Sequence, residues 1–403
     1  MKQRAAVSES GDRGIETTDR AATMAGIVAS CFGFVVIGAL QALYGPAIPH
    51  LLETFAITPA QAGLALSAHF VGALIGVLVF NRAHTLLTNR QLLAASYGAM
   101  ALGCLLFAAA PVWSVALVGA FVIGLGFGGV DFGLNFLFSI GFGRRSASMV
   151  NLLNAHFGVG AVLGPLAVAW FGPESFRAIF LAFGIAALVP LLVGSAISND
   201  VGSRASAGGE AGASEPARRR TTLLVIGAFF AIYVLHVAIE TGVGGWATTH
   251  LVAVGYGAAF AAGATSAYWL AMTLGRFGAA WLTLRATPAQ IMVGACIGMT
   301  LSLLAATSGT LAPVAYVLVG LFIAPIFPTG LAWLASVHPA SRNATASVIA
   351  VSMVGGIAFP PLIGGVITLA GAPAAPLFMA ALSAICLLAA IAIVAAVRSR
   401  SAR

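Results

Sequence analysis

Two acidic side chains lie inside long apolar stretches, and they are the residues most able to do chemistry. Of the 11 Asp and Glu residues, only Asp131 and Glu240 fall within such stretches. A carboxylate in hydrocarbon is penalised by about 2.5 to 3.5 kcal/mol on insertion scales, so such residues usually face a bundle interior or a cavity and often mark proton or ion paths. Both are therefore candidates for proton coupling.

Asp131 lies in the segment GLGFGGVDFGLN, and Asn135 follows one helical turn later on the same face. Burial disfavours the charged form of a carboxylate. This acid could bind a proton in one access state and release it when water reaches it in the other, which would couple transport to the proton gradient. The alternative is an Asp that only holds a neighbouring helix through hydrogen bonds.

Glu240 shares a helical face with His236 and Tyr233. A His and a Glu on one stripe could form a proton relay, which makes His236 a second candidate for proton coupling, or a polar wall for a substrate. Three glycines follow Glu240 within five residues and would permit local unwinding. A Glu–His pair that simply neutralises itself is the alternative.

Neutral polar and aromatic residues within the apolar stretches supply candidate substrate contacts. Amides donate and accept hydrogen bonds at once, which matches sugar hydroxyls, while an aromatic face covers the apolar side of a sugar ring. The same amides can instead bridge membrane helices. The candidates, with Tyr233 and Asn135 included, are Gln41, Tyr44, Asn135, Asn151, Asn154, His156, Tyr233, Tyr268 and Trp269.

Two further groups of residues are expected to serve gating and packing. Arg276 lies near the end of its apolar stretch, where its long side chain could reach water, and an inner-gate or loop contact is favoured over substrate binding. Gly160, Gly164 and Pro165 permit close helix packing and bending, which halves that rock against each other require.

The composition fixes the class of protein that must position these residues. Hydrophobic residues make up 60% of the 403 and charged residues 7%, and the mean hydropathy is +1.02. This excludes a soluble globular protein and indicates a polytopic membrane protein.

The net charge of +8 is spread over single arginines and short clusters, so nucleic acid is not an expected partner. The 4 cysteines have no paired spacing, and we expect no metal and no cofactor.

Twelve apolar runs are long enough to cross about 30 Å of hydrocarbon as helices. The alternating strands of a membrane barrel are absent, so the expected fold is all-α with twelve transmembrane helices. The predicted spans are 24–45, 60–80, 91–110, 113–140, 149–171, 176–196, 222–250, 258–283, 289–308, 312–336, 344–370 and 375–397.

Basic residues predict the orientation of the twelve spans. Of the 19 Lys and Arg residues, only Arg177 falls in a loop on the side opposite the termini, and Arg276 lies within a span. Because basic residues favour the cytoplasmic side, both termini are expected there, in a plasma (inner) membrane. The expected organisation is a cytoplasmic tail (1–23), a six-helix half (24–196), a cytoplasmic linker (197–221), a second six-helix half (222–397) and a short tail (398–403).

The two halves match at a nearly fixed offset. Ser67, Ala68 and Gly76 reappear 199 positions later as Ser266, Ala267 and Gly275, and Gln41 and Gly45 correspond to Glu240 and Gly244. The fifth-span pattern of Gly160, Gly164 and Pro165 has a looser echo in the eleventh span at an offset of 196. Such a repeat predicts two parallel halves that face each other, the plan of an alternating-access transporter.

The chain from residue 24 to 397 resembles the major facilitator superfamily. Within it, AIPHLLETFAITPAQAGLALSAHF, GLGFGGVDFGLN, IFPTGLAW and ASVIAVSMVGGIAFPPLIGG are similar to the fucose permease type of sugar and proton symporter. The resemblance implies that Asp131 is the essential acid of such symporters. It departs at Gly45, where relatives of that permease carry a second acid, and at Asn81, where many facilitators place Asp.

These observations predict a monomeric secondary transporter that moves a neutral sugar-like solute together with protons across a lipid bilayer. The rival is proton-antiport efflux of drugs or metabolites, because the pattern of Gly160, Gly164 and Pro165 resembles a motif of facilitator antiporters.

An enzyme is not expected, because HExxH and the Gly-Asp pattern of an intramembrane aspartyl protease are absent from the sequence. A channel would need more repeats than two, and no Walker motif indicates the use of ATP.

Overall fold

A computed structural model of the chain describes residues 23–192, 216–337 and 342–401. These residues form helices and no strand. The α-helices are α1 (Met24–Phe55), α2 (Pro59–Ala83), α3 (Asn89–Ala109), α4 (Trp113–Gly141), α5 (Ser146–Phe171), α6 (Phe176–Ala186), α7 (Val189–Leu192), α8 (Pro216–Ala253), α9 (Ala258–Leu282), α10 (Pro288–Ala305), α11 (Ala312–Ile323), α12 (Ile326–Val337), α13 (Arg342–Ala370) and α14 (Ala374–Ser401).

The predicted twelve-span, all-α fold is confirmed. Eleven stretches of the described chain are helical, long and apolar enough to cross a membrane, with α6 joined to α7 and α11 to α12 in single spans. The remaining helix, α9, packs between α5 and α11 and completes the twelve. α8 begins at Pro216, inside the stretch predicted as linker, and α14 runs to Ser401 through most of the predicted C-terminal tail. The rest of the linker and nearly all of the N-terminal tail lie outside the described residues.

The predicted end of the first span at residue 45 was wrong. α1 continues for ten residues to Phe55, although Pro46 and Pro49 lie inside it. A proline removes one helical hydrogen bond, but membrane helices tolerate this because neighbouring helices and local adjustments satisfy the freed carbonyl. The helix ends at Ala56, whose left-handed φ of 50° turns the chain toward α2.

Matching caps begin equivalent helices in the two halves. Thr88 and Gln91 form a capping box at the start of α3, and Thr287 and Gln290 form the same box at the start of α10, 199 residues later. In each, the Thr side chain accepts from the backbone of Gln, and the Gln side chain accepts from the backbone N–H of Thr. The sequence repeat is therefore a repeat of local structure.

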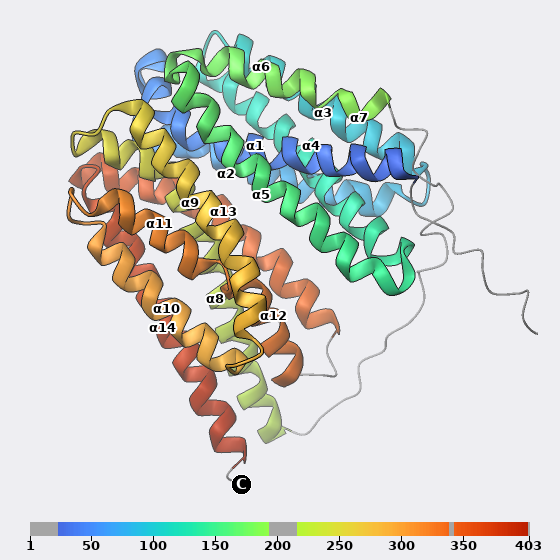
Figure 1. Cartoon of the computed structure of the whole chain (residues 1–403), viewed down its shortest axis with the longest axis vertical. Coiled ribbons are helices and arrows are strands. Elements are labelled where there is room, and N and C mark those ends of the chain that lie inside the picture. The colour runs from blue at the N-terminus through green and yellow to red at the C-terminus, as the bar shows by residue number, and fades with distance from the viewer. Residues whose placement is uncertain (1–22, 193–215, 338–341, 402–403) are drawn as a thin grey trace, which may run out of the picture.

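The two halves meet at one end of the bundle and diverge toward the other (Figure 1). We call the end where α1 and α8 begin and α14 ends the tail end, and the opposite end, which holds the turns after α1 and α8, the far end. Across the halves, α2 packs on α13, α5 on α9, and α1 on α8. These are the pairs that a pseudo-twofold axis between two six-helix repeats generates.

Specific contacts between the halves lie in the far-end part of the bundle. A Cβ on Gly45 of α1 would collide with the backbone carbonyl of Gly244 on α8, so the two helices touch backbone to backbone. Gly45 and Gly244 correspond under the repeat offset of 199. Equivalent residues that touch each other must lie on or next to the pseudo-twofold axis.

Candidate functional site

A chain of side-chain hydrogen bonds joins α4 to α5 in the N-terminal half. The Asn135 amide donates to Oδ1 of Asp131 over 3.0 Å, and the Asn154 amide donates to Oδ1 of Asn135 over 3.2 Å. Spacing of four residues places Asp131 and Asn135 on one face of α4. Asp131 and Asn135 are half-buried, whereas Asn154 is exposed. The arrangement links a carboxylate inside the bundle to a water-accessible amide through two hydrogen bonds.

An aromatic layer separates this polar chain from the far end. Phe127, one turn before Asp131 on α4, packs edge-on against His69 of α2, with ring centroids 4.9 Å apart. Nδ1 of His69 lies 3.3 Å from the hydroxyl of Tyr44, and both residues are fully buried. Tyr44, predicted to contact substrate, therefore occupies its hydroxyl with His69 inside the helix packing.

A second polar cluster lies in the C-terminal half. Nε2 of His236 is 3.2 Å from Oε2 of Glu240, a distance typical of an ion pair, although the N–H direction does not fit a hydrogen bond. The hydroxyl of Tyr268 on α9 donates to the backbone carbonyl of Glu240 over 3.3 Å. Arg276 lies on α9 two turns beyond Tyr268, and among the described residues no ion pair joins it to Glu240. A carboxylate and an imidazole on α8 thus lie beside the hydroxyl of Tyr268 on α9.

The aromatic members of this cluster are held by packing. Tyr233 donates its hydroxyl to the carbonyl of Phe327 on α12, next to His236, and is fully buried. The ring of Trp269 lies against Gly244, and its buried indole N–H has no hydrogen-bond partner among the residues that the structure describes. A buried donor without an acceptor is costly, so Trp269 is the aromatic residue here with free capacity for a hydrogen bond.

Residues from both halves lie at the depth in the bundle where the two halves begin to separate. Gly158 of α5 touches α9, because a Cβ at this position would meet the side chain of Thr273. Of the described glycines at which α5 and α9 touch, Gly158 lies nearest the tail end. Asn154 lies one turn beyond Gly158 toward the tail end, and Arg276 lies one turn beyond Thr273 in the same direction. Polar groups from both halves therefore come to the same depth, about two turns inside the tail end of α5.

Among the described residues, no side-chain hydrogen bond joins the other predicted residues to these clusters. Asn151 is exposed near the start of α5, and Gln41 is half-buried in α1. Nδ1 of His156 lies 2.8 Å from the carbonyl of Leu152 in its own helix. Gly160 and Gly164 pack against the backbone of α1, with Pro165 buried beside them, so they serve close contact between α1 and α5.

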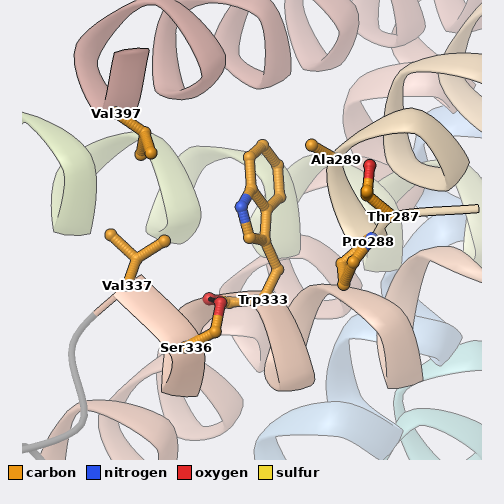
Figure 2. A pocket seen from close by; sticks show the side chains of 7 residues that line it. All are labelled: Thr287, Pro288, Ala289, Trp333, Ser336, Val337 and Val397. Atoms are coloured by element: carbon orange, nitrogen blue, oxygen red, sulfur yellow. Dashed lines mark hydrogen bonds between the residues drawn. The ribbon is translucent and has the colours of Figure 1, made fainter. Parts of the chain in front are cut away.

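A pocket at the tail end of the C-terminal half is separate from both clusters. It lies between the start of α10 and the ends of α12 and α14 (Figure 2). The Trp333 ring lies between two valines on one side and Pro288 and Ala289 on the other. None of its lining residues is charged, so it does not share the chemistry of the site. The lining residues are Thr287, Pro288, Ala289, Trp333, Ser336, Val337 and Val397.

The profile of the Major Facilitator Superfamily matches residues 30–350. The chain belongs to the major facilitator superfamily. Its members carry solutes across membranes, and this chain is a multi-pass membrane protein of that kind. The resemblance seen in the sequence is thus confirmed for the superfamily. A comparison with curated protein sequences finds no match.

Solved structures share the fold of this facilitator. The nucleoside transporter NupG superposes with a TM-score of 0.75 at 12% identity, covering 92% of this chain and 98% of that one. A D-xylose–proton symporter gives 0.71 at 12% identity, with 92% and 96% covered. A bacterial homologue of the human lysosomal transporter Spinster, in an inward-facing and occupied conformation, gives 0.69 at 16% identity, with 93% and 96% covered.

Two serines that join the halves could not be identified as contact residues from the sequence alone. Ser67 and Ser266 were recognised only as a repeat, yet each donates a hydrogen bond across the halves, to the carbonyls of Ile357 and Val162. The signal was present, because both serines are small polar residues at equivalent positions of spans that face the other half. Their partners are backbone carbonyls, which carry no sequence signature.

Proposed function

We propose that this facilitator is a proton-coupled symporter of a neutral, sugar-like solute, as the resemblance to the fucose permease type implies. The observation that carries the proposal is the hydrogen-bonded chain Asp131–Asn135–Asn154. A carboxylate that is half-buried in one state and linked to an exposed amide is suited to load and release a proton as access changes. The amides at the end of the chain present donors and acceptors suited to hydroxyl groups.

The charge bias of the loops supports an orientation for this cycle. Most arginines of the described residues lie at the tail end, which supports our proposal that the termini lie in the cytoplasm, at a plasma (inner) membrane. Divergence of the halves at the tail end then corresponds to a state open to the cytoplasm. A D-xylose–proton symporter shares the fold, which is compatible with sugar symport. We propose that the protein works as a monomer, because each pseudo-symmetric half supplies one polar cluster.

Proton-antiport efflux is the alternative function. Gly160 and Gly164 carry the antiporter-like pattern, but both pack against the backbone of α1 within one half. Any tight α1–α5 contact needs small residues there. The pattern therefore does not favour export over import. The polar character of Asn135 and Asn154 favours a hydroxylated solute over an apolar drug.

An uptake screen tests the proposed function. Purified protein in proteoliposomes, given an inward proton gradient, is expected to accumulate one of the hexoses or 6-deoxyhexoses above the external concentration. Collapse of the gradient by a protonophore should release the excess. Accumulation of none of these solutes, combined with gradient-driven expulsion of known efflux substrates, would favour the antiport alternative.

Glu240→Gln is expected to weaken solute binding while proton coupling is kept. The glutamine retains the shape of the side chain but loses the negative charge that lies 3.2 Å from His236, so the polar wall proposed for the solute loses its charged hydrogen-bond acceptor. Loss of one charge-assisted interaction corresponds to about 1.5 to 3 kcal/mol, or roughly a 10- to 150-fold weaker binding. Isothermal titration gives the affinity, and solute-driven proton flux at saturating solute gives the coupling. Unchanged affinity with lost proton flux would move Glu240 into the proton path.

A further inference from the structure

We propose that Ser67 and Ser266 form a paired hydrogen-bond latch that sets the balance between the two access states. The inference depends on the alternating access of the superfamily fold and not on the identity of the solute or on protons. Its failure is therefore distinguishable from failure of the proposed function.

Each serine donates a hydrogen bond from one half to the other. Oγ of Ser67 on α2 donates to the carbonyl of Ile357 on α13 over 2.5 Å, and Oγ of Ser266 on α9 donates to the carbonyl of Val162 on α5 over 2.8 Å. Most hydroxyls within the described helices instead bond a carbonyl one turn back in their own helix, as Ser302 does in α10. The two serines thus contribute their hydroxyls to the interface between halves.

The two bonds are related by the internal repeat. Ser266 follows Ser67 by 199 residues, and Val162 precedes Ile357 by 195, within one residue of the offset of 196 that relates α5 to α13. We call the contact surface between two helices of different halves a seam. One bond therefore lies in the α2–α13 seam, and its counterpart lies in the α5–α9 seam. A pseudo-twofold axis passes between them, next to the contact of Gly45 with Gly244.

The seams around the serines are closely packed in this state. Around Ser67, the ring of Phe70 lies against Gly356, and Gly63 lies against the backbone of Pro360. Ser67 and Ser266 are themselves 9% and 5% exposed. Two halves that move as packed bodies cannot open one seam at the far end and keep the other closed. Both serine bonds must therefore break in the same step.

The energetic effect of the latch is limited by water. When the far end opens, each serine hydroxyl exchanges its carbonyl acceptor for water. The bond therefore stabilises the closed arrangement only by the net free energy of that exchange. Removing one hydroxyl should raise the ratio of far-end-open to far-end-closed molecules by about 2- to 10-fold. Because the two bonds lie between different helix pairs, share no partner and break together, removing both should multiply the two factors, to roughly 4- to 100-fold.

The test uses spin labels that report both ends of the bundle. After replacement of the four native cysteines by alanine, one pair of labels is placed at Thr54 and Leu369 at the far end. A second pair is placed at Ser148 and Ser336 near the tail end. All four positions are exposed. Distance distributions are then recorded for the full chain carrying Ser67→Ala, Ser266→Ala or both, with Ser302→Ala as a matched control whose hydroxyl bonds within one helix.

Each latch variant is expected to increase the long-distance population at the far end and the short-distance population at the tail end. The double variant should exceed either single one, and Ser302→Ala should match the parent. Unchanged distributions in the double variant would overturn the latch, and so would equal shifts in Ser302→Ala, which would indicate loss of packing. A shift in only one single variant would overturn the pairing. A melting temperature within a few degrees of the parent establishes that each variant is folded.

Discussion

Replacing Asp131 by Asn is expected to abolish uphill accumulation of solute while leaving solute exchange largely intact. The amide keeps the shape of the carboxylate and its contact with Asn135, but it cannot bind and release a proton. With one proton per solute, a gradient of one pH unit supplies about 1.4 kcal/mol and supports an accumulation of at most about tenfold. The variant should level off near the external concentration. Radiolabelled solute uptake in proteoliposomes, with and without the gradient, measures this difference.

Two controls accompany the Asp131 variant. Glu174→Gln neutralises an exposed acid at the far end and should leave accumulation unchanged. Counterflow, in which unlabelled internal solute draws in labelled solute, needs binding and access change but no proton gradient. Persistent counterflow with lost accumulation isolates the coupling step. Undiminished uphill uptake by Asp131→Asn would remove this carboxylate from the mechanism.

Gly45→Ala is expected to reduce transport strongly by keeping the far end open. The added methyl group would collide with the backbone carbonyl of Gly244, and a backbone cannot move aside as a flexible side chain can. Overpacking of this kind costs about 1 to 3 kcal/mol, so the far-end-closed state should lose roughly 5- to 150-fold in population. The same spin labels at Thr54 and Leu369 report this shift directly, and the initial rate of counterflow reports its consequence for transport.

Gly263→Ala is the matched control for this substitution. Gly263 lies on α9, and a Cβ there meets no atom within 4 Å. An alanine at that position should leave both the label distances and the counterflow rate near those of the parent. If Gly45→Ala transported normally with unchanged distances, the contact between Gly45 and Gly244 would have no part in closing the far end.

The same contact accounts for a departure from the family resemblance. Relatives of the fucose permease type carry an acid where this chain has Gly45. Here that position touches Gly244 of the other half, so no side chain fits in the far-end-closed state. The carboxylates of the two polar clusters are those of Asp131 and Glu240. We therefore expect no first-span acid to take part in the proton coupling that we propose.

Much of the fold could be predicted because each membrane helix is specified by its own sequence. A stretch of about 20 apolar residues must satisfy its backbone internally, so length and hydropathy identified the spans, and the distribution of arginines separated their two ends. The pairing of Asp131 with Asn135 followed from a spacing of four residues. The extension of α1 beyond Pro46 could not be seen, since proline is a helix breaker in water and a tolerated residue between packed membrane helices.

The parts of the site that depend on tertiary contacts could not be predicted. Tyr44 was expected to face a substrate, but its hydroxyl meets His69, and nothing in a spacing of 25 residues indicates that contact. The role of Arg276 at an inner gate or in a loop stays a prediction, because no ion pair of its side chain is seen among the described residues. A side chain of this length can reach several partners, so its spacing in the sequence does not identify one.

The most direct test is the direction of proton movement when solute is added without any gradient. Proteoliposomes with a pH indicator outside are given solute, and the external pH is followed for the parent protein and for Asp131→Asn. Proton-coupled symport predicts alkalinisation outside with the parent protein and no pH change with the variant. Acidification would indicate antiport, and alkalinisation that persists in Asp131→Asn would contradict the assignment of proton coupling to that residue.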